Sequence, residues 1–158
     1  MQGLAVGKVV TEGDSPVTVF GVFTEIGIIN QLATRLFESF LPAGMSLAQF
    51  SVLDHIGRLD GDWTPARLAN VFQVPRPTMT HTLQRLAAAK LVNFVANPRD
   101  ARGKIVRLTA KGRAQRDAAR DAATPLLEAI GAAMPAGLFA ALLPPLGALR
   151  AFLDAAGD

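Results

Sequence analysis

Apolar residues recur at steps of three and four along most of this chain, a spacing that predicts a mainly helical protein. The first run predicts a long amphipathic helix from about residue 15 to residue 42, where Pro42 and Gly44 end it. Its apolar stripe consists of Phe23, Ile26, Ile29, Leu32, Leu36, Phe37 and Phe40. Ser46 then caps a second helix, which ends at the turn signal in residues 60–62.

Two shorter helices with a brief break between them follow. Thr64 is an N-cap directly before Pro65, which predicts a helix that runs to about Phe72. The next helix, from about residue 76 to residue 89, has an inward row of apolar side chains at Met79, Leu83 and Leu86. This leaves polar side chains to face outward, namely Thr78, His81, Gln84 and Arg85. Two helices joined by so short a turn predict a helix-turn-helix.

A β-hairpin is predicted directly after this pair of helices. Residues 91–96 and 104–108 contain several β-branched residues and flank the turn-forming segment 97–103, which makes the tip basic. Thr109 then caps a fifth helix, long and rich in Ala, that runs to about residue 133. The fold class is therefore mainly α with a small β-hairpin wing, a winged helix-turn-helix flanked by further helices.

The stretch of residues 129–149 contains no charged residue and reaches the length of a membrane-spanning helix. Three prolines and three glycines interrupt it, and much of its apolar content is Ala, so it makes a poor span. We expect instead a pair of short helices that are apolar on most sides, with Pro144 and Pro145 kinking or dividing the helix that contains them. A second copy of the chain would bury them.

Charge is segregated along the sequence. Ten of the 16 Lys and Arg residues lie between Thr64 and Arg113, where Asp100 is the only acid, so this segment carries a formal charge of +9. The remaining residues sum to −6. A concentrated positive field suits a polyanion such as nucleic acid, because each base that neutralises a phosphate releases counterions. A solvated basic face without a partner is the alternative.

Composition excludes several classes of function. Cysteine is absent, which removes disulfides, Cys-ligated zinc, iron–sulfur clusters and thiol redox sensing. Tyrosine is also absent, and His55 and His81 are the only histidines, so we expect no metal site and no cofactor. No Gly-rich phosphate loop and no cluster of acids is present, and we therefore predict a protein that is not an enzyme. The first ten residues lack a signal-peptide core, which favours the cytoplasm.

The central segment resembles the signature of the MarR family of bacterial winged helix-turn-helix transcription regulators. The matching stretches are Leu68-Ala69, residues 74–80, Leu86, Leu91-Val92, residues 97–104 and residues 106–112. The Asp-Xaa-Arg wing followed by Leu-Thr-Xaa-Xaa-Gly is the most specific part. The resemblance implies a homodimer in which residues 16–45 and 114–158 form the dimerisation region, residues 46–113 bind DNA, and residues 1–15 are a flexible arm.

The resemblance also implies a function, that of a sequence-specific binder of double-stranded DNA at a near-palindromic site, usually a repressor. The residues that we expect to contact DNA are Arg76, Pro77, Thr78, Thr80, His81, Gln84, Arg85, Arg99, Asp100, Arg102 and Lys104. Arg102 resembles the family's minor-groove arginine, and Asp100 the carboxylate that holds it. Arg99 and Lys104 would contact phosphates. Pro75 departs from the family, in which a side-chain cap usually precedes the recognition helix.

Family resemblance further suggests a small aromatic or phenolic anion that binds between the dimerisation helices and the winged helix and releases DNA. Candidate lining residues are Phe37, Phe40, Phe50, His55, Arg58 and Trp63, although Phe at helical spacing is usually core. Two alternatives remain open at this point. One is a winged helix that binds proteins and no longer binds DNA, and the other is a DNA binder without an effector.

Overall fold

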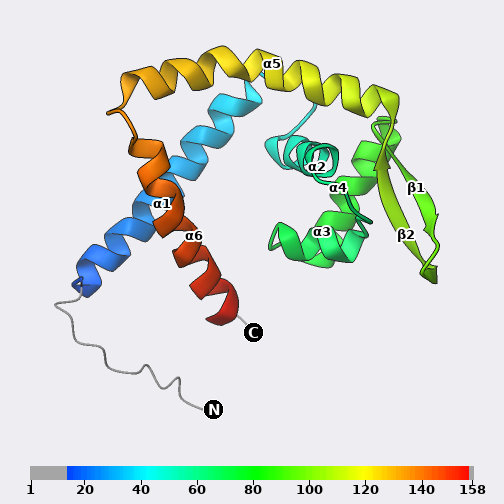
Figure 1. The fold of residues 1–158 in the computed structure, drawn as a ribbon, viewed down its shortest axis with the longest axis horizontal. Helices are drawn as coiled ribbons and strands as arrows, with labels where there is room; N and C mark the ends of the chain where they lie inside the picture. The colour runs from blue at the N-terminus through cyan, green and yellow to red at the C-terminus, as the bar shows by residue number, and fades with distance from the viewer. Residues whose placement is uncertain (1–13, 157–158) are drawn as a thin grey trace. The chain divides into compact units, whose positions relative to one another are not determined.

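The computed structural model describes residues 14–156 and contains six helices and one two-stranded sheet within that range (Figure 1). The elements are α1 (Pro16–Glu38), α2 (Leu47–Arg58), α3 (Pro65–Val71), α4 (Arg76–Ala88), β1 (Val92–Asn97), β2 (Asp100–Leu108), α5 (Ala110–Ala133) and α6 (Leu138–Ala156). The chain divides into two compact units, Met1–Ser39 and Phe40–Asp158. Of the expected flexible arm, residues 1–13 lie outside the described residues.

The first unit contains α1. Ser15 caps this helix by accepting a hydrogen bond from the Thr18 N–H, and Pro16 stands in its first turn. The helix ends at Glu38, four residues before the predicted end, because Ser39 already leads into the turn before Pro42. None of its residues is buried, and its large apolar side chains are exposed at many positions, among them Val17, Phe20, Phe23, Ile28, Ile29 and Leu32.

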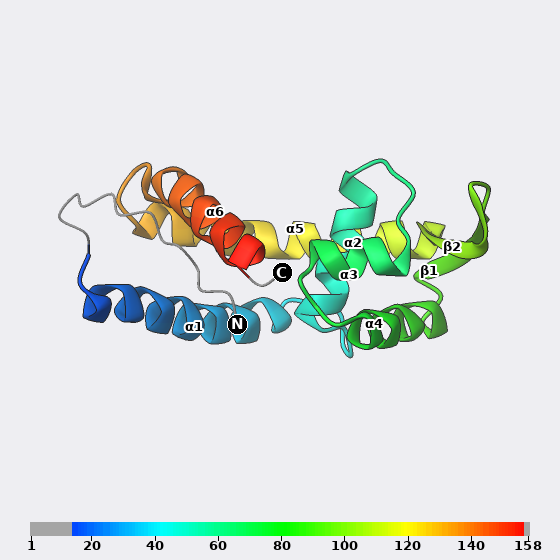
Figure 2. The same ribbon diagram turned by 90° about the horizontal axis from the view of Figure 1, so that it is seen from below.

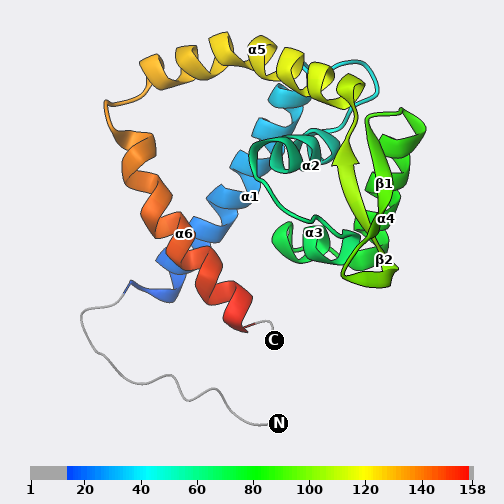
Figure 3. The same cartoon turned by 45° about the vertical axis from the view of Figure 1, so that its right-hand side comes forward.

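The second unit is built around a winged helix-turn-helix, as the sequence predicts. Helix α3 packs against α4, and the β1–β2 hairpin lies beside them, as Figure 3 shows. Their shared core includes Val52, Leu53, Leu68, Leu83 and Leu86, all at or below 1% exposure. Ser46 and Gln49 form a reciprocal capping box at the start of α2, which fixes where that helix enters the core.

The hairpin differs from the prediction at its tip. Residues 97–103 were expected to form the turn, but Asn97 already pairs with Asp100, so that only two residues connect the strands. The Asn97 side chain closes this turn by accepting a hydrogen bond of 3.0 Å from the Arg99 N–H. Pairing resumes at Ala96 and Lys104, which leaves residues 101–103 as an insertion in β2.

Helix α5 begins at the predicted cap, Thr109, and runs past the wing and α2 (Figure 2). A Cβ atom at Gly112 would lie far inside the contact distance of the Leu91 carbonyl oxygen, so only glycine permits this approach. The helix is joined to α2 by Arg116, whose Nε lies 3.2 Å from the Asp54 carboxylate.

The C-terminal part corrects the prediction of two short helices. One 19-residue helix, α6, crosses Pro144 and Pro145 without a break, and the division falls instead at residues 134–137, where Gly137 has a φ of +79°. The prolines remove the usual donors for the Ala140 and Ala141 carbonyls but do not end the helix. No residue of α6 is buried. By length and composition, α1 and α6 could each span a membrane.

Candidate nucleic-acid interface

Helix α4 is oriented as its apolar spacing predicts. Met79, Leu83 and Leu86 are buried in the core, which fixes the opposite side of the helix toward the outside. Seven of the predicted contact residues are exposed on α4, namely Arg76, Pro77, Thr78, Thr80, His81, Gln84 and Arg85. The hydroxyl of Thr80 donates a 2.9 Å hydrogen bond to the Arg76 carbonyl, so its oxygen retains acceptor capacity.

The start of α4 has fewer backbone N–H donors than most helix ends. Pro75 is the N-cap residue and makes no side-chain capping bond, as its departure from the family pattern predicts. Pro75 and Pro77 both lack a backbone N–H, which removes two donors from the helix end that would otherwise attract an anion. The Arg76 side chain, between these prolines, can supply the missing positive charge. The preceding turn is held by Gln73, which adopts a left-handed φ of +50°.

The wing carries the remaining predicted contacts. Arg99, Asp100 and Lys104 are exposed on the hairpin. Asp100 lies close over Gly103, because a Cβ atom added there would be 2.9 Å from its Oδ2. The side chain of Arg102 lies outside the described part of the wing, and its proposed pairing with Asp100 stays a prediction.

Three basic residues of the positive segment form hydrogen bonds within the protein and do not only add to its positive electrostatic field. Arg107 binds the Gly61 carbonyl and the Asp62 carboxylate, each at 2.6 Å. The Lys111 Nζ donates a 2.9 Å hydrogen bond to the Ala89 carbonyl at the end of α4. Arg113 donates to the Leu108 carbonyl at 3.2 Å. Other basic side chains on α4, its C-terminal turn and the wing are exposed and available to bind a polyanion: Arg76, Arg85, Lys90, Arg99 and Lys104.

His55, on α2, is half-buried beside two aromatic residues. Its ring packs edge-on against Trp63 and Phe72, with centroid distances of 4.4 and 5.4 Å. Its Nε2 atom is buried without a hydrogen-bond partner. Burial, and then the positive charges of Arg58 and Arg67, lower the pKa of His55 below its ordinary value of 6.5, against the opposing effect of Asp54. Within residues 14–156, no group of three or more His, Asp or Glu side chains is placed to hold a metal ion.

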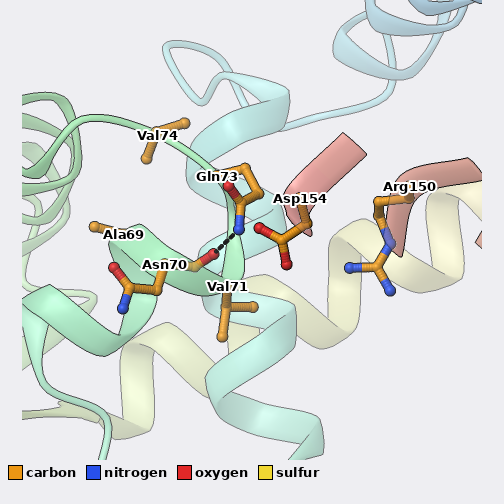
Figure 4. Close-up of a pocket in the computed structure, with 7 residues that line it drawn as sticks. All are labelled: Ala69, Asn70, Val71, Gln73, Val74, Arg150 and Asp154. Carbon is orange, nitrogen blue, oxygen red and sulfur yellow. Dashed lines mark hydrogen bonds between the residues drawn. The ribbon is translucent and has the colours of Figure 1, made fainter. Parts of the chain in front are cut away.

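A hollow of about 710 Å³ lies between the end of α3 and α6 (Figure 4). Arg150 and Asp154 line it from α6, and the opposite side is lined by Ala69, Asn70, Val71, Gln73 and Val74. The Gln73 amide donates a 2.9 Å hydrogen bond to the Asn70 carbonyl. None of the six lining residues suggested by the sequence borders this hollow, because Phe50, His55 and Trp63 belong to the helix-turn-helix core or pack against it.

Comparison with known proteins shows that the central part of this chain is similar to one family. A model of the MarR family matches residues 43–103. The multiple antibiotic resistance protein MarR of Escherichia coli K12 is 38% identical over 90 residues, which are 56% of this chain and 62% of the relative. The MarR of Salmonella typhimurium is 37% identical over the same length. The chain thus matches less than two thirds of these relatives' length.

A solved structure extends the similarity over most of the chain. A cysteine-to-serine mutant of E. coli MarR, complexed with operator DNA, superimposes with a TM-score of 0.74 at 28% identity. The match covers 87% of this chain and 99% of that one. The similarity therefore includes the helices on both sides of the winged helix-turn-helix.

Proposed function

We propose that this chain, whose residues 43–103 match a model of the MarR family, is a sequence-specific regulator of transcription that binds double-stranded DNA as a homodimer and represses until a small ligand releases it. The observation that carries the proposal is the surface of α4 and the wing. Every side chain there that we predict to contact DNA and that the structure describes is exposed. Exposed Lys and Arg side chains lie on both elements. We propose no catalytic role.

We assign roles to the contact residues by their chemistry. Arg76, Gln84 and Arg85 are suited to base edges, because Arg can bind guanine and Gln can bind adenine with two hydrogen bonds. Pro77, Thr78, Thr80 and His81 complete the face of α4 that enters the major groove. On the wing, Arg99 and Lys104 bind phosphates, while Arg102 enters the minor groove and Asp100 restricts its rotamers beforehand.

The homodimer accounts for the exposed apolar helices. Both α1 and α6 expose large apolar side chains along their length, which in water requires a partner surface. A second copy fits better than a lipid bilayer, because α6 carries Pro144, Pro145 and Gly147, while α1 carries Glu25 and Arg35. We therefore propose a soluble cytoplasmic dimer with residues 16–45 and 114–158 at its interface. Its two-fold axis would match a near-palindromic site.

The hollow between α3 and α6 is our proposed effector site. Arg150 can pair with an anion, and Asn70 and Gln73 add polar groups at the turn that leads into α4. The lining residues that the structure describes include no aromatic side chain, which favours a small organic anion without requiring a phenol. Benzoate, but not neutral benzamide, should release bound DNA from the wild type and have little effect on Arg150→Gln. Equal release of both proteins would place the effector elsewhere.

The function itself is tested by fluorescence anisotropy with the duplex upstream of the coding region and a scrambled duplex of equal length. We expect tighter binding to the upstream duplex, with a steep dependence on salt. Arg102→Ala should reduce the slope of log affinity against log salt concentration by about one for each wing that contacts the duplex. Arg120→Ala removes the same charge from α5 and should leave the slope unchanged. Equal, weak binding of both duplexes by the wild type would contradict regulation of its own promoter, and equal binding of all promoters tested would contradict sequence-specific binding altogether.

A further inference from the structure

We propose that Arg107 is a positioning residue for DNA binding: it holds the wing at the angle that DNA requires and does not itself contact phosphate. The inference rests on the proposed function, because it concerns the same DNA-binding surface. From its position in the positive segment alone, Arg107 would be expected to add to the electrostatic field that attracts DNA. The inference gives it a structural role instead.

The guanidinium of Arg107 is held at two points. Nη1 donates a 2.6 Å hydrogen bond to the Gly61 carbonyl, and Nη2 donates one of 2.6 Å to Oδ1 of Asp62. Both partners belong to the turn between α2 and α3, 45 and 46 residues away in the sequence. Such charge-assisted bonds fix orientation as well as distance. The side chain is therefore a tie between the root of the wing and the helix-turn-helix.

The same turn contacts β2 through its backbone. The Val106 N–H donates a 2.8 Å hydrogen bond to the Trp63 carbonyl, directly beside the Arg107 contact. An isolated two-stranded hairpin is marginally stable and has no rigid orientation of its own. The backbone bond and the buried side chains of Val92 and Val106 attach the root of the wing to the helices, and the Arg107 guanidinium adds a neighbouring attachment. This added attachment resists a tilt of the hairpin about its root.

The geometry of a strand amplifies any change at this root. Arg107 stands opposite Asn93, whereas the strands meet at Asn97 and Asp100 near the tip. Residues 101–103 are an insertion, so the length of the hairpin is set by β1, where the four residues from Asn93 to Asn97 span roughly 13 Å at about 3.3 Å per residue. A tilt of about 10° at the root would then displace the tip by about 2 Å, more than a hydrogen bond to DNA tolerates. The wing contacts thus depend on the Arg107 tie.

The charge of Arg107 is balanced where it lies. The Asp62 carboxylate neutralises it. To bind a phosphate, Arg107 would have to give up this ion pair, and it would only exchange one anionic partner for another. If Arg107 bound a phosphate, removal of the Asp62 carboxylate that competes for its guanidinium would strengthen DNA binding, whereas a positioning Arg107 would lose its anchor and binding would weaken. The two roles are therefore distinguishable by measurement.

The decisive variant is Asp62→Asn, which removes one negative charge from the protein and weakens the tie. Electrostatics alone predicts tighter DNA binding, whereas the positioning role predicts weaker binding, by about tenfold if the wing contacts are lost. Asp60→Asn is the matched control, because Asp60 is an exposed acid of the same turn and undergoes the same change of charge. It should bind at least as tightly as the wild type.

The experiment measures anisotropy of the upstream duplex across a salt series with the full-length protein. We expect Arg107→Ala and Asp62→Asn to weaken binding by a similar factor and to lower the salt slope alike, because both displace the phosphate contacts of the wing, and the exchange Asp62→Arg with Arg107→Asp to recover part of the loss. Asp62→Asn that binds as tightly as Asp60→Asn, or a loss of affinity in Arg107→Ala that Asp62→Asn does not share, would overturn the inference. A wild type that binds no duplex specifically would instead overturn the proposed function, and the inference with it.

Discussion

Gly112 has no side chain, and this allows the start of α5 to approach the backbone that follows α4. The Leu91 carbonyl oxygen occupies the space that a Cβ atom would need, and the Thr109 N–H and hydroxyl also bond to this carbonyl, at 3.1 and 3.2 Å. Thr109 donates a 2.7 Å hydrogen bond to the Lys90 carbonyl as well. These contacts fasten the end of α4 to the start of α5, so the Leu-Thr-Xaa-Xaa-Gly motif is structural.

Gly112→Ala should therefore destabilise the protein even though alanine favours helix. The added methyl group must displace the Leu91 backbone, and we expect a loss of about 2–3 kcal/mol of unfolding free energy, measured by urea denaturation. Gly131→Ala, in the same helix with open space around it, should instead be neutral or stabilise by up to about 1 kcal/mol. Equal stability of the Gly112→Ala protein and the wild type would contradict the close approach.

His55 makes stability depend on pH. The pKa of His55 is lowered from 6.5 in the folded protein, mainly by burial, so the unfolded chain binds a proton more readily. Stability is therefore complete above about pH 6.5 and falls as the pH decreases from there toward the lowered value. Urea denaturation at about pH 7.5 and 5.5 should show this loss in the wild type. His55→Gln should show a smaller pH dependence, and the same dependence in both proteins would exclude His55 as its cause.

At the scale of elements, α4 and the wing should divide the work of recognition. Arg85→Ala is expected to reduce the preference for the upstream duplex over the scrambled one by about tenfold, because a base contact is lost. Lys104→Ala should weaken binding to both duplexes alike and reduce the salt slope by about one. Anisotropy with the two duplexes measures both effects. A loss of specificity in Lys104→Ala, or none in Arg85→Ala, would reverse these assignments.

Local patterns account for the elements that the sequence predicted well. Ser46, Thr64 and Thr109 each mark a helix start with a side-chain cap, and the spacing of Met79, Leu83 and Leu86 fixes the buried side of α4. The outward direction of the candidate contact residues follows from that spacing alone. For these elements, the information lies within a few residues of the chain.

Three features were missed, one that depends on a distant contact and two that are local. The Arg107 tie joins residues 45 apart, so no local pattern could distinguish this base from one that meets DNA. The tight tip of the wing depends on the Asn97 side chain, and the insertion at residues 101–103 was read as turn. The continuity of α6 through Pro144 and Pro145 was also missed, since prolines inside a helix usually end it.

At the scale of the whole molecule, dimerisation should depend on the apolar surface of α6. Leu143 is 71% exposed, and Leu143→Glu would place a charge in the proposed interface. We expect this variant to sediment as a monomer at concentrations where the wild type is a dimer, and to lose specific DNA binding. Leu59→Glu, the same change at an exposed leucine just after α2, should remain dimeric. A dimeric Leu143→Glu protein would exclude this part of α6 from the interface.

The central claim is that two copies of the α4 and wing surface read one duplex together. Hydroxyl-radical footprinting of the upstream duplex tests it most directly, because it maps contacts on each strand. The account predicts two protected segments of near-palindromic sequence, about one helical turn, or roughly 34 Å, apart, with further protection where the wings reach the flanking minor groove. A single protected segment, or uniform protection without a preferred sequence, would contradict it.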